Sequence, residues 1–218
     1  MATLLHIDSS VLPGSESASR AVAETFLRAW QEQHPDGTVI HRDLTVTPVS
    51  HISAAAQHAG YVDPDQHTAE QAEAFAERKA LIEELEQADA VLIGAPMYNL
   101  SVPSTLKAWI DNVVLIGRTA MGAATLKGKP VTVIASRGGS YGPGTPRDGY
   151  DYVQNFLEGV FDMMLGMEID FIVPELTGAP VDPAMSQLVP LFEASRTRAH
   201  EEATVKAKQL AARLTDAA

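Results

Sequence analysis

The chain has 218 residues and a net charge of -12, a length that is enough to bury a core as one domain, and we expect residues 1–218 to form a single domain. The excess of acidic side chains disfavours binding to nucleic acid or to an anionic membrane surface. There is no cysteine, which excludes thiolate catalysis, iron–sulfur clusters and disulfide bonds, and the 7 histidines show no metal-ligand spacing, so no metal site is expected. The start of the chain lacks the basic region of a leader peptide, and no apolar run approaches about 20 residues, so we expect a cytoplasmic protein.

Apolar, β-branched runs alternate along the chain with helical patterns. The runs predict five strands, at residues 3–8, 38–44, 90–97, 130–136 and 168–175. The patterns between them predict helices at about 22–33, 68–87, from Pro103 to 113, 152–165 and 183–214. Strict alternation of strand and helix predicts an α/β fold, a doubly wound five-stranded parallel sheet of order 2-1-3-4-5. Two segments, 47–67 and 137–151, are too long for plain connectors, so one or both are expected to be lids or interface loops.

In a sheet of this order, ligands bind outside the carboxyl ends of the strands, where the strand order reverses. The loop after the first strand reads SSVLPGSESASR, residues 9–20, and combines several serine hydroxyls with the amino end of a helix, which favours an anion. It has neither a dinucleotide-binding glycine motif nor a P-loop, so a phosphate monoester fits it better than a nucleoside triphosphate. The simpler interpretation is that Ser17 or Ser19 only caps the helix.

Two further loops end neighbouring strands. After the third strand, Pro96 and the residues Met-Tyr-Asn-Leu offer apolar side chains and backbone N–H groups to a flat heteroaromatic ring, although Met97 or Tyr98 alone are more often core residues. After the fourth strand, Gly138 and Gly139 allow backbone N–H groups to approach a ligand edge that gains negative charge, although such a pair is most often a turn, and Arg137 most often a solvated charge. FMN is the ligand that uses all three loops.

The ordered segments SS…GSESAS, PMYN…LKAWID and SRGG…GP resemble the FMN-dependent NADH azoreductases, also classed as NADH:quinone oxidoreductases, over nearly the whole chain. The resemblance implies a flavodoxin-like homodimer with FMN near the dimer interface, and two-electron transfer from NADH or NADPH to quinones or azo compounds. It implies that FMN itself carries the hydride transfer, without a catalytic side chain. The cofactor-binding residues that it implies are Ser10, Ser17, Ala18 and Ser19 for the phosphate, Met97, Tyr98, Asn99 and Leu100 for the isoalloxazine ring, and Ser136, Arg137, Gly138 and Gly139 for its pyrimidine side.

The chain departs from this family in two places, and two other functions stay open. The family usually has an aromatic Thr-Phe segment after the third helix, where residues 116–130 here contain no aromatic residue, and the loop after SRGG carries Tyr141 and two prolines. A flavodoxin-type electron carrier without catalytic activity would use the same crevice. Ser140 lies in a G-x-S-x-G pattern typical of serine hydrolases, but the prolines that follow do not suit the required helix, and His200, the one histidine downstream, is expected to be solvated.

Overall fold

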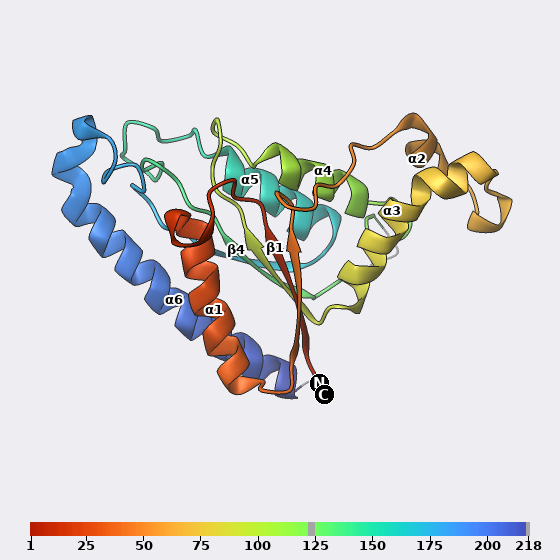
Figure 1. Ribbon diagram of the computed structural model, residues 1–218, viewed down its shortest axis with the longest axis horizontal. Coiled ribbons are helices and arrows are strands. Elements are labelled where there is room, and N and C mark those ends of the chain that lie inside the picture. Colours follow the sequence, from red (N-terminus) through yellow and green to blue (C-terminus); the bar gives the residue numbers. More distant parts are fainter. Residues whose placement is uncertain (122–124, 217–218) are drawn as a thin grey trace.

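The computed structural model describes residues 1–121 and 125–216, and its centre is one parallel sheet (Figure 1). The strands are β1 (Thr3–Asp8), β2 (Thr38–Asp43), β3 (Ala90–Gly94), β4 (Pro130–Ile134) and β5 (Glu168–Ile172). They pair in parallel in the order β2-β1-β3-β4-β5, which confirms the predicted topology. Every residue of β3 is buried, whereas the edge strands β2 and β5 are mostly half-buried or exposed, as expected for a sheet covered on both faces.

The helices confirm the predicted alternation and add elements that the sequence did not reveal. They are η1 (Gly14–Glu16), α1 (Ala18–Gln33), α2 (Ala54–Ala59), η2 (Pro64–Gln66), α3 (Ala69–Gln87), α4 (Ser104–Val113), α5 (Tyr152–Glu158), η3 (Gly159–Met164), η4 (Pro183–Leu188) and α6 (Val189–Asp216). Residues 47–67, one of the two segments expected to be lids or interface loops, contain α2 and η2. The predicted helix at 152–165 is an α-helix only in its first half, and η3 continues it as a π-helix.

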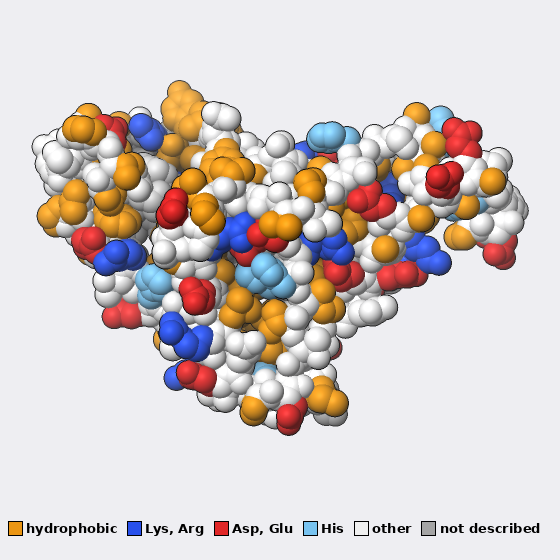
Figure 2. Space-filling view, in the orientation of Figure 1, with side chains coloured by type: hydrophobic (Ala, Val, Ile, Leu, Met, Phe, Trp, Pro, Cys, Tyr) orange, Lys and Arg blue, Asp and Glu red, His pale blue; other side chains and the backbone are white. Residues whose placement is uncertain are grey.

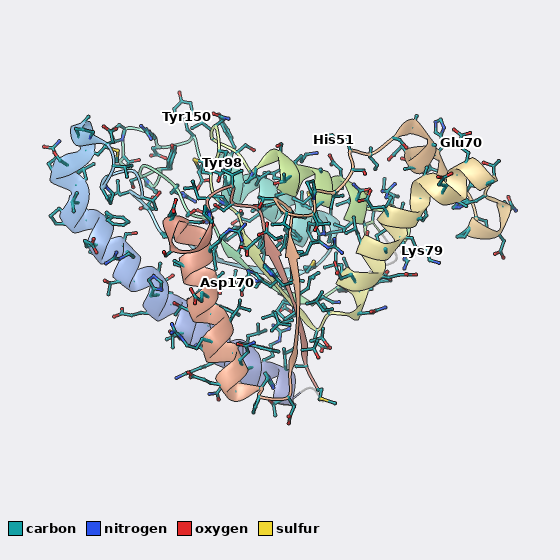
Figure 3. All side chains as sticks on the ribbon, viewed as in Figure 1. His51, Glu70, Lys79, Tyr98, Tyr150 and Asp170 are labelled. Atoms are coloured by element: carbon teal, nitrogen blue, oxygen red, sulfur yellow. The ribbon has the colours of Figure 1, made fainter. Side chains whose placement is uncertain are left out.

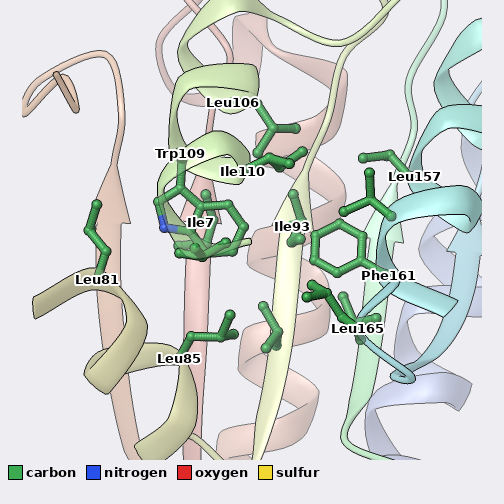
Figure 4. Close-up of a cluster of buried hydrophobic side chains, with 14 of the residues drawn as sticks. Ile7, Leu81, Leu85, Ile93, Leu106, Trp109, Ile110, Leu157, Phe161 and Leu165 are labelled. Atoms are coloured by element: carbon green, nitrogen blue, oxygen red, sulfur yellow. The ribbon is translucent and has the colours of Figure 1, made fainter. Parts of the chain in front are cut away.

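Two layers of helices cover the sheet (Figure 1). Helices α3, α4 and α5 lie on one face, where Trp109 and Phe161 are fully buried between strands and helices (Figure 4). Thr68 begins α3 with a capping box, because its hydroxyl accepts from the Gln71 N–H and its own N–H donates to the Gln71 side chain. Along this helix Arg78 is buried, which an apolar pattern does not predict.

Helices α1 and α6 lie side by side on the other face (Figure 1). Four buried alanines of α6 lie toward α1 and the sheet, at Ala199, Ala203, Ala207 and Ala211. Their small side chains allow close packing on α1, whose Trp30 is fully buried. His200 is half-buried and its Nδ1 lies 2.8 Å from the Thr25 hydroxyl of α1, so the expectation of a solvated His200 was wrong.

Among the helices formed by residues 1–121 and 125–216, none combines the length and apolar character that crossing a membrane requires.

Candidate cofactor site

The three predicted loops meet at the carboxyl edge of the sheet. The Tyr98 hydroxyl, from the loop after β3, accepts from the Val11 N–H at 3.1 Å and lies 3.4 Å from the Ser10 hydroxyl, which belongs to the loop after β1. The Met97 N–H donates at 2.7 Å to the carbonyl of Ser136, which belongs to the loop after β4. Tyr98 therefore links the first two loops at this edge (Figure 3), and Met97 links the second to the third.

The serine loop forms a buried polar group at the start of α1. Ser17 is the N-cap of α1, because its hydroxyl accepts from the Arg20 N–H, and this hydroxyl also lies 3.1 Å from that of Ser19. Ser17 thus caps the helix, and two further donors remain at this end: within the described part of the chain, the N–H groups of Ala18 and Ser19 have no acceptor. Unpaired N–H groups and the dipole at the start of a 16-residue helix attract an anion.

The other serines of this loop have different roles. The buried Ser9 hydroxyl donates to the Gly94 carbonyl at 2.6 Å, and so fixes β1 to the end of β3. Ser15 is exposed. Ser10 is buried, with its hydroxyl between the Leu12 N–H and the Tyr98 hydroxyl. The structure therefore groups Ser10, Ser17 and Ser19 at the buried side of the loop.

The loop after β3 contains a tight turn with a strained backbone. The backbones of Tyr98 and Ser101 exchange two hydrogen bonds, and the residues between them have positive φ angles, 50° for Asn99 and 71° for Leu100. Asparagine tolerates this conformation, but a leucine there costs roughly 1–2 kcal/mol. Such strain concentrates at binding sites. In the described residues, the N–H groups of Asn99 and Leu100 have no acceptor.

The loop after β4 is held from behind by the segment after β5. The carbonyls of Arg137, Gly138 and Gly139 accept from the N–H groups of residues 177, 178 and 176 in that order. The N–H groups of Gly138 and Gly139 have no acceptor in the described chain, so they are available to a ligand. A Cβ on Gly139 would lie only 2.5 Å from the Arg147 guanidinium, so Arg147 already approaches this backbone closely.

Arg137 is buried, with 3 % of its surface exposed, so the expectation of a solvated charge was wrong. Its guanidinium lies 2.5 Å from the Asp151 carboxylate and donates to Gln154 at 2.9 Å, which ties the loop to the start of α5. The residue thus has a structural role at the site, which the spacing of the sequence did not indicate.

Ser140 has no histidine partner among the described residues. Its hydroxyl donates to both oxygens of the Glu175 carboxylate, at 3.1 and 3.2 Å, and the Tyr141 N–H donates to the same carboxylate. His200, the histidine that a hydrolase would need, is bound to Thr25 of α1. The described residues thus give Ser140 no Ser–His pair, so the geometry does not support the hydrolase alternative.

A charged cluster lies directly beneath the serine loop. The Arg20 guanidinium lies 3.0 Å from Asp8 and 2.8 Å from Asp43, and it donates to the Ser10 carbonyl at 2.8 Å. Burial raises the pKa of the Asp8 and Asp43 carboxyls, but the charges and hydrogen bonds of neighbouring groups outweigh burial and lower both pKa values. For Asp8 these neighbours are His6, whose Nε2 lies 3.5 Å from the carboxylate, the hydrogen-bonded His41 and Arg20. Arg20 therefore fixes the position of Ser10 through its ion pairs on β1 and β2.

Two histidines belong to this cluster. His6, Asp8 and His41 bring atoms of the kind that bind metals within 4.8 Å of one another. The sequence pattern does not predict this group, because His41 comes from β2 and the other two residues from β1. The two imidazole rings are stacked, with centroids 4.7 Å apart and planes 15° from parallel, and the Nε2 atoms of both lie near the Asp8 carboxylate, at 3.5 Å for His6 and 3.0 Å for His41. Asp8 already pairs with Arg20. The cluster is therefore explained as an ion-pair network.

The chain matches the family model described as "Flavodoxin-like fold" over residues 2–189. It belongs to this family. The flavodoxin-like chain is also 69 % identical over 214 residues to an FMN-dependent NADH:quinone oxidoreductase of Streptomyces avermitilis, a match that covers 98 % of this chain and 99 % of the relative. It is 62 % identical over 215 residues to the protein of the same description from Streptomyces coelicolor, covering 99 % of this chain and 98 % of the relative.

Among solved structures, an azoreductase from Bacillus anthracis superposes on the flavodoxin-like chain with a TM-score of 0.83 and 23 % identity, covering 96 % of this chain and all of the other. An FMN-dependent NADH-azoreductase from the same species, solved in complex with FMN, gives a TM-score of 0.79 and 20 % identity, covering 96 % of this chain and 99 % of the other. At these identities the likeness shows the fold. The segment 116–130, which lacks the aromatic residue usual in the azoreductases, includes residues 122–124, which lie outside the described residues.

Proposed function

We propose that the protein is an FMN-dependent oxidoreductase that transfers two electrons from NADH or NADPH to quinones and to azo compounds. The observation that carries the proposal is the group of unpaired N–H groups that three loops present at one edge of the sheet, at residues 18–19, 99–100 and 138–139. Its support from relatives is the 69 % identity, over nearly the whole chain, to a protein described as an FMN-dependent NADH:quinone oxidoreductase.

The residues at the start of α1 fit the phosphate of FMN. The N–H groups of Ala18 and Ser19, together with the hydroxyls of Ser10, Ser17 and Ser19, form an anion site of the kind that suits a phosphate monoester. Arg20 is turned away from this site, toward Asp8 and Asp43, so it braces the loop and leaves phosphate binding to neutral donors.

The other two loops fit the isoalloxazine ring. FMN, when bound, supplies an acceptor for hydride and a store for two electrons, a capacity that a chain without cysteine does not have itself. Met97 is half-buried on the core and Leu100 is 38 % exposed, so together they form an apolar edge that excludes water from the ring. The N–H groups of Gly138 and Gly139 stabilise negative charge on the pyrimidine side, and Tyr98 holds the first two loops together.

The test is to purify the protein, identify the released flavin, and measure NADH oxidation with menadione as the acceptor. A yellow protein that releases FMN and oxidises NADH with menadione in the absence of any other protein confirms the proposal. A flavin-loaded protein that oxidises NADH only when a partner reductase is added is an electron carrier, and a colourless protein that does not bind added FMN contradicts the proposal.

The proposal extends to assembly and location. Residues 1–218 act as one FMN-binding domain, and two copies form a homodimer in the cytoplasm, where NADH and NADPH are supplied. Residues 47–67, which include the short helix α2, and residues 137–151 are the two segments of which one or both are expected to form the interface or a lid. Sedimentation velocity at micromolar concentration tests the dimer: a flavin-loaded monomer that oxidises NADH contradicts it. Fractionation of producing cells tests the location.

A further inference from the structure

A cavity lies beside the loop after β4, between residues 139–147 and the start of α6. Its volume is about 640 Å³, which is within the range of small-molecule pockets. Most of its wall is apolar, formed by Pro146, Leu176, Met185, Leu188 and Leu191. Figure 1 shows the start of α6 next to the loop that follows β4, and in Figure 2 apolar side chains gather over this end of α6, at the upper left, beside cationic ones.

Two arginines, Arg147 and Arg198, line this apolar cavity, and both are exposed. Within residues 1–121 and 125–216, neither forms an ion pair with an acid, although the chain has a net charge of -12. The pattern is unlike that of Arg196, two residues before Arg198 on α6, which pairs with Glu193 at 2.6 Å. Guanidinium groups without a carboxylate partner, at the wall of an apolar cavity, are suited to bind the anionic group of a ligand.

Glu175 also lines the cavity, but among the described residues it forms no ion pair with either arginine. The carboxylate of Glu175 is bound on the loop side, where it accepts from the Ser140 hydroxyl and the Tyr141 N–H. Arg147 is held in place by the Tyr141 ring, whose centroid is 5.4 Å from the guanidinium carbon, and by the bond to the Tyr141 hydroxyl at 3.1 Å. The cavity therefore has a positively charged group, Arg147, which Tyr141 holds in place and which a ligand can still reach.

The cavity also adjoins the proposed cofactor site, because both include Gly139. The Arg147 guanidinium lies so close to Gly139 that a Cβ there would be 2.5 Å away. The N–H of Gly139 is one of the donors assigned to the pyrimidine side of the flavin. A flat molecule in the cavity, with its anionic group at the arginines, would therefore lie beside the residues that are proposed to hold the flavin.

From these observations we infer that the cavity selects aromatic electron acceptors that carry an ionised acidic group, and that Arg147 and Arg198 bind this group. The apolar wall accepts the aromatic rings, and the two guanidinium groups determine the preference for an anion over a neutral acceptor of the same shape. This inference rests on the proposed function for the identity of the acceptor, but the binding of an aromatic anion in the cavity does not depend on electron transfer.

The first experiment measures binding without electron transfer. Titration calorimetry on the FMN-loaded protein compares naphthalene-2-carboxylate with the neutral naphthalene-2-carboxamide, in wild type, Arg147→Gln, Arg198→Gln and the control Arg196→Gln. We expect wild type and the control to bind the carboxylate at least fivefold more tightly than the amide, and both cavity variants to lose most of this preference. Equal affinities for the two compounds in wild type, or an undiminished preference in both cavity variants, would overturn the inference even in an active enzyme.

The second experiment measures acceptor choice. 2-Hydroxy-1,4-naphthoquinone is an anion at neutral pH, and 2-methoxy-1,4-naphthoquinone is its neutral counterpart. We take the ratio of kcat/KM for the anionic quinone to kcat/KM for the neutral one. Comparing this ratio between variants and wild type cancels the difference in redox potential between the two quinones. We expect this ratio to fall at least fivefold in Arg147→Gln and to stay at the wild-type value in Arg196→Gln. A constant ratio together with a higher KM for NADH in Arg147→Gln assigns the cavity to the donor and refutes the inference.

Discussion

Replacing Ser17 and Ser19 by alanine tests the phosphate site most directly. The Ser17 hydroxyl caps α1, and a lost N-cap costs about 1 kcal/mol of stability. The hydroxyls of Ser17 and Ser19 lie 3.1 Å apart, so either single substitution leaves the other buried hydroxyl without this partner. The double substitution removes both groups, and we therefore expect it to lower the free energy of unfolding of the apoprotein by no more than the cap alone, a fall in Tm of roughly 2–4 °C.

The effect on FMN is larger and specific to its phosphate. Two hydroxyls that donate to a phosphate contribute about 1–3 kcal/mol, so FMN should bind about 5- to 160-fold more weakly to the double variant. Riboflavin, which lacks the phosphate, should lose little affinity. The assay is flavin fluorescence quenching on the apoprotein with both ligands, together with thermal unfolding without ligand.

Ser53→Ala is the matched control for the loss of a cap. Ser53 caps α2 in the same way, with its hydroxyl accepting from the Ala56 N–H at 3.1 Å, but it lies outside the three loops of the site. This variant should lower Tm and leave the FMN-to-riboflavin preference at the wild-type value. If FMN and riboflavin weaken by the same factor in the Ser17 and Ser19 double variant, the phosphate is bound elsewhere and the assignment is wrong.

Three further predictions concern the flavin edge, the charged cluster and the kinetics. Gly139→Val should abolish FMN retention, because its side chain would block the approach of the flavin to the Gly139 N–H. The far-ultraviolet circular dichroism of the apoprotein should stay near wild type, because the valine displaces only the flexible end of Arg147; normal FMN occupancy contradicts the site. Asp8 and Asp43 have lowered pKa values in the folded protein, so the stability that they add is present above about pH 4 and is lost as the pH falls further. Arg20→Gln should therefore shift the midpoint of acid unfolding to higher pH, whereas Arg28→Gln, an exposed position on the same helix, should not; equal midpoints exclude the cluster as the cause. Double-reciprocal plots of NADH oxidation at several menadione concentrations should be parallel, because nicotinamide and quinone would have to stack on the same exposed face of the flavin; intersecting lines mean that both bind together.

The topology could be predicted because it depends on periodicity. Alternating β-branched and helical segments allow few arrangements of a parallel sheet, and turn residues mark where the segments end. The capping box of Thr68 and Gln71 was predictable for the same reason, since its residues are three positions apart. The loops of the site also followed from topology, because the carboxyl ends of neighbouring strands meet.

The features that the sequence did not reveal depend on contacts between distant residues. Arg137 can be buried because it pairs with Asp151 and donates to Gln154, which come from another element. Arg78 can be buried because it donates to the carbonyls of Asn112 and Val114. The cluster of His6 and His41 likewise forms only when β1 and β2 pair. Helix α2 escaped prediction because six residues are too few to show a helical period.

The packing of α6 on α1 has a consequence for the order in which the protein is completed. The face of the sheet that carries Leu4 and Leu92 is covered partly by α6, whose buried alanines at residues 199–211 are synthesised after all five strands. While the chain grows on the ribosome, this apolar face has α1 but no second helix over it, so the nascent protein exposes surface on which chains associate. β1 thus stays incompletely covered until α6 has been synthesised.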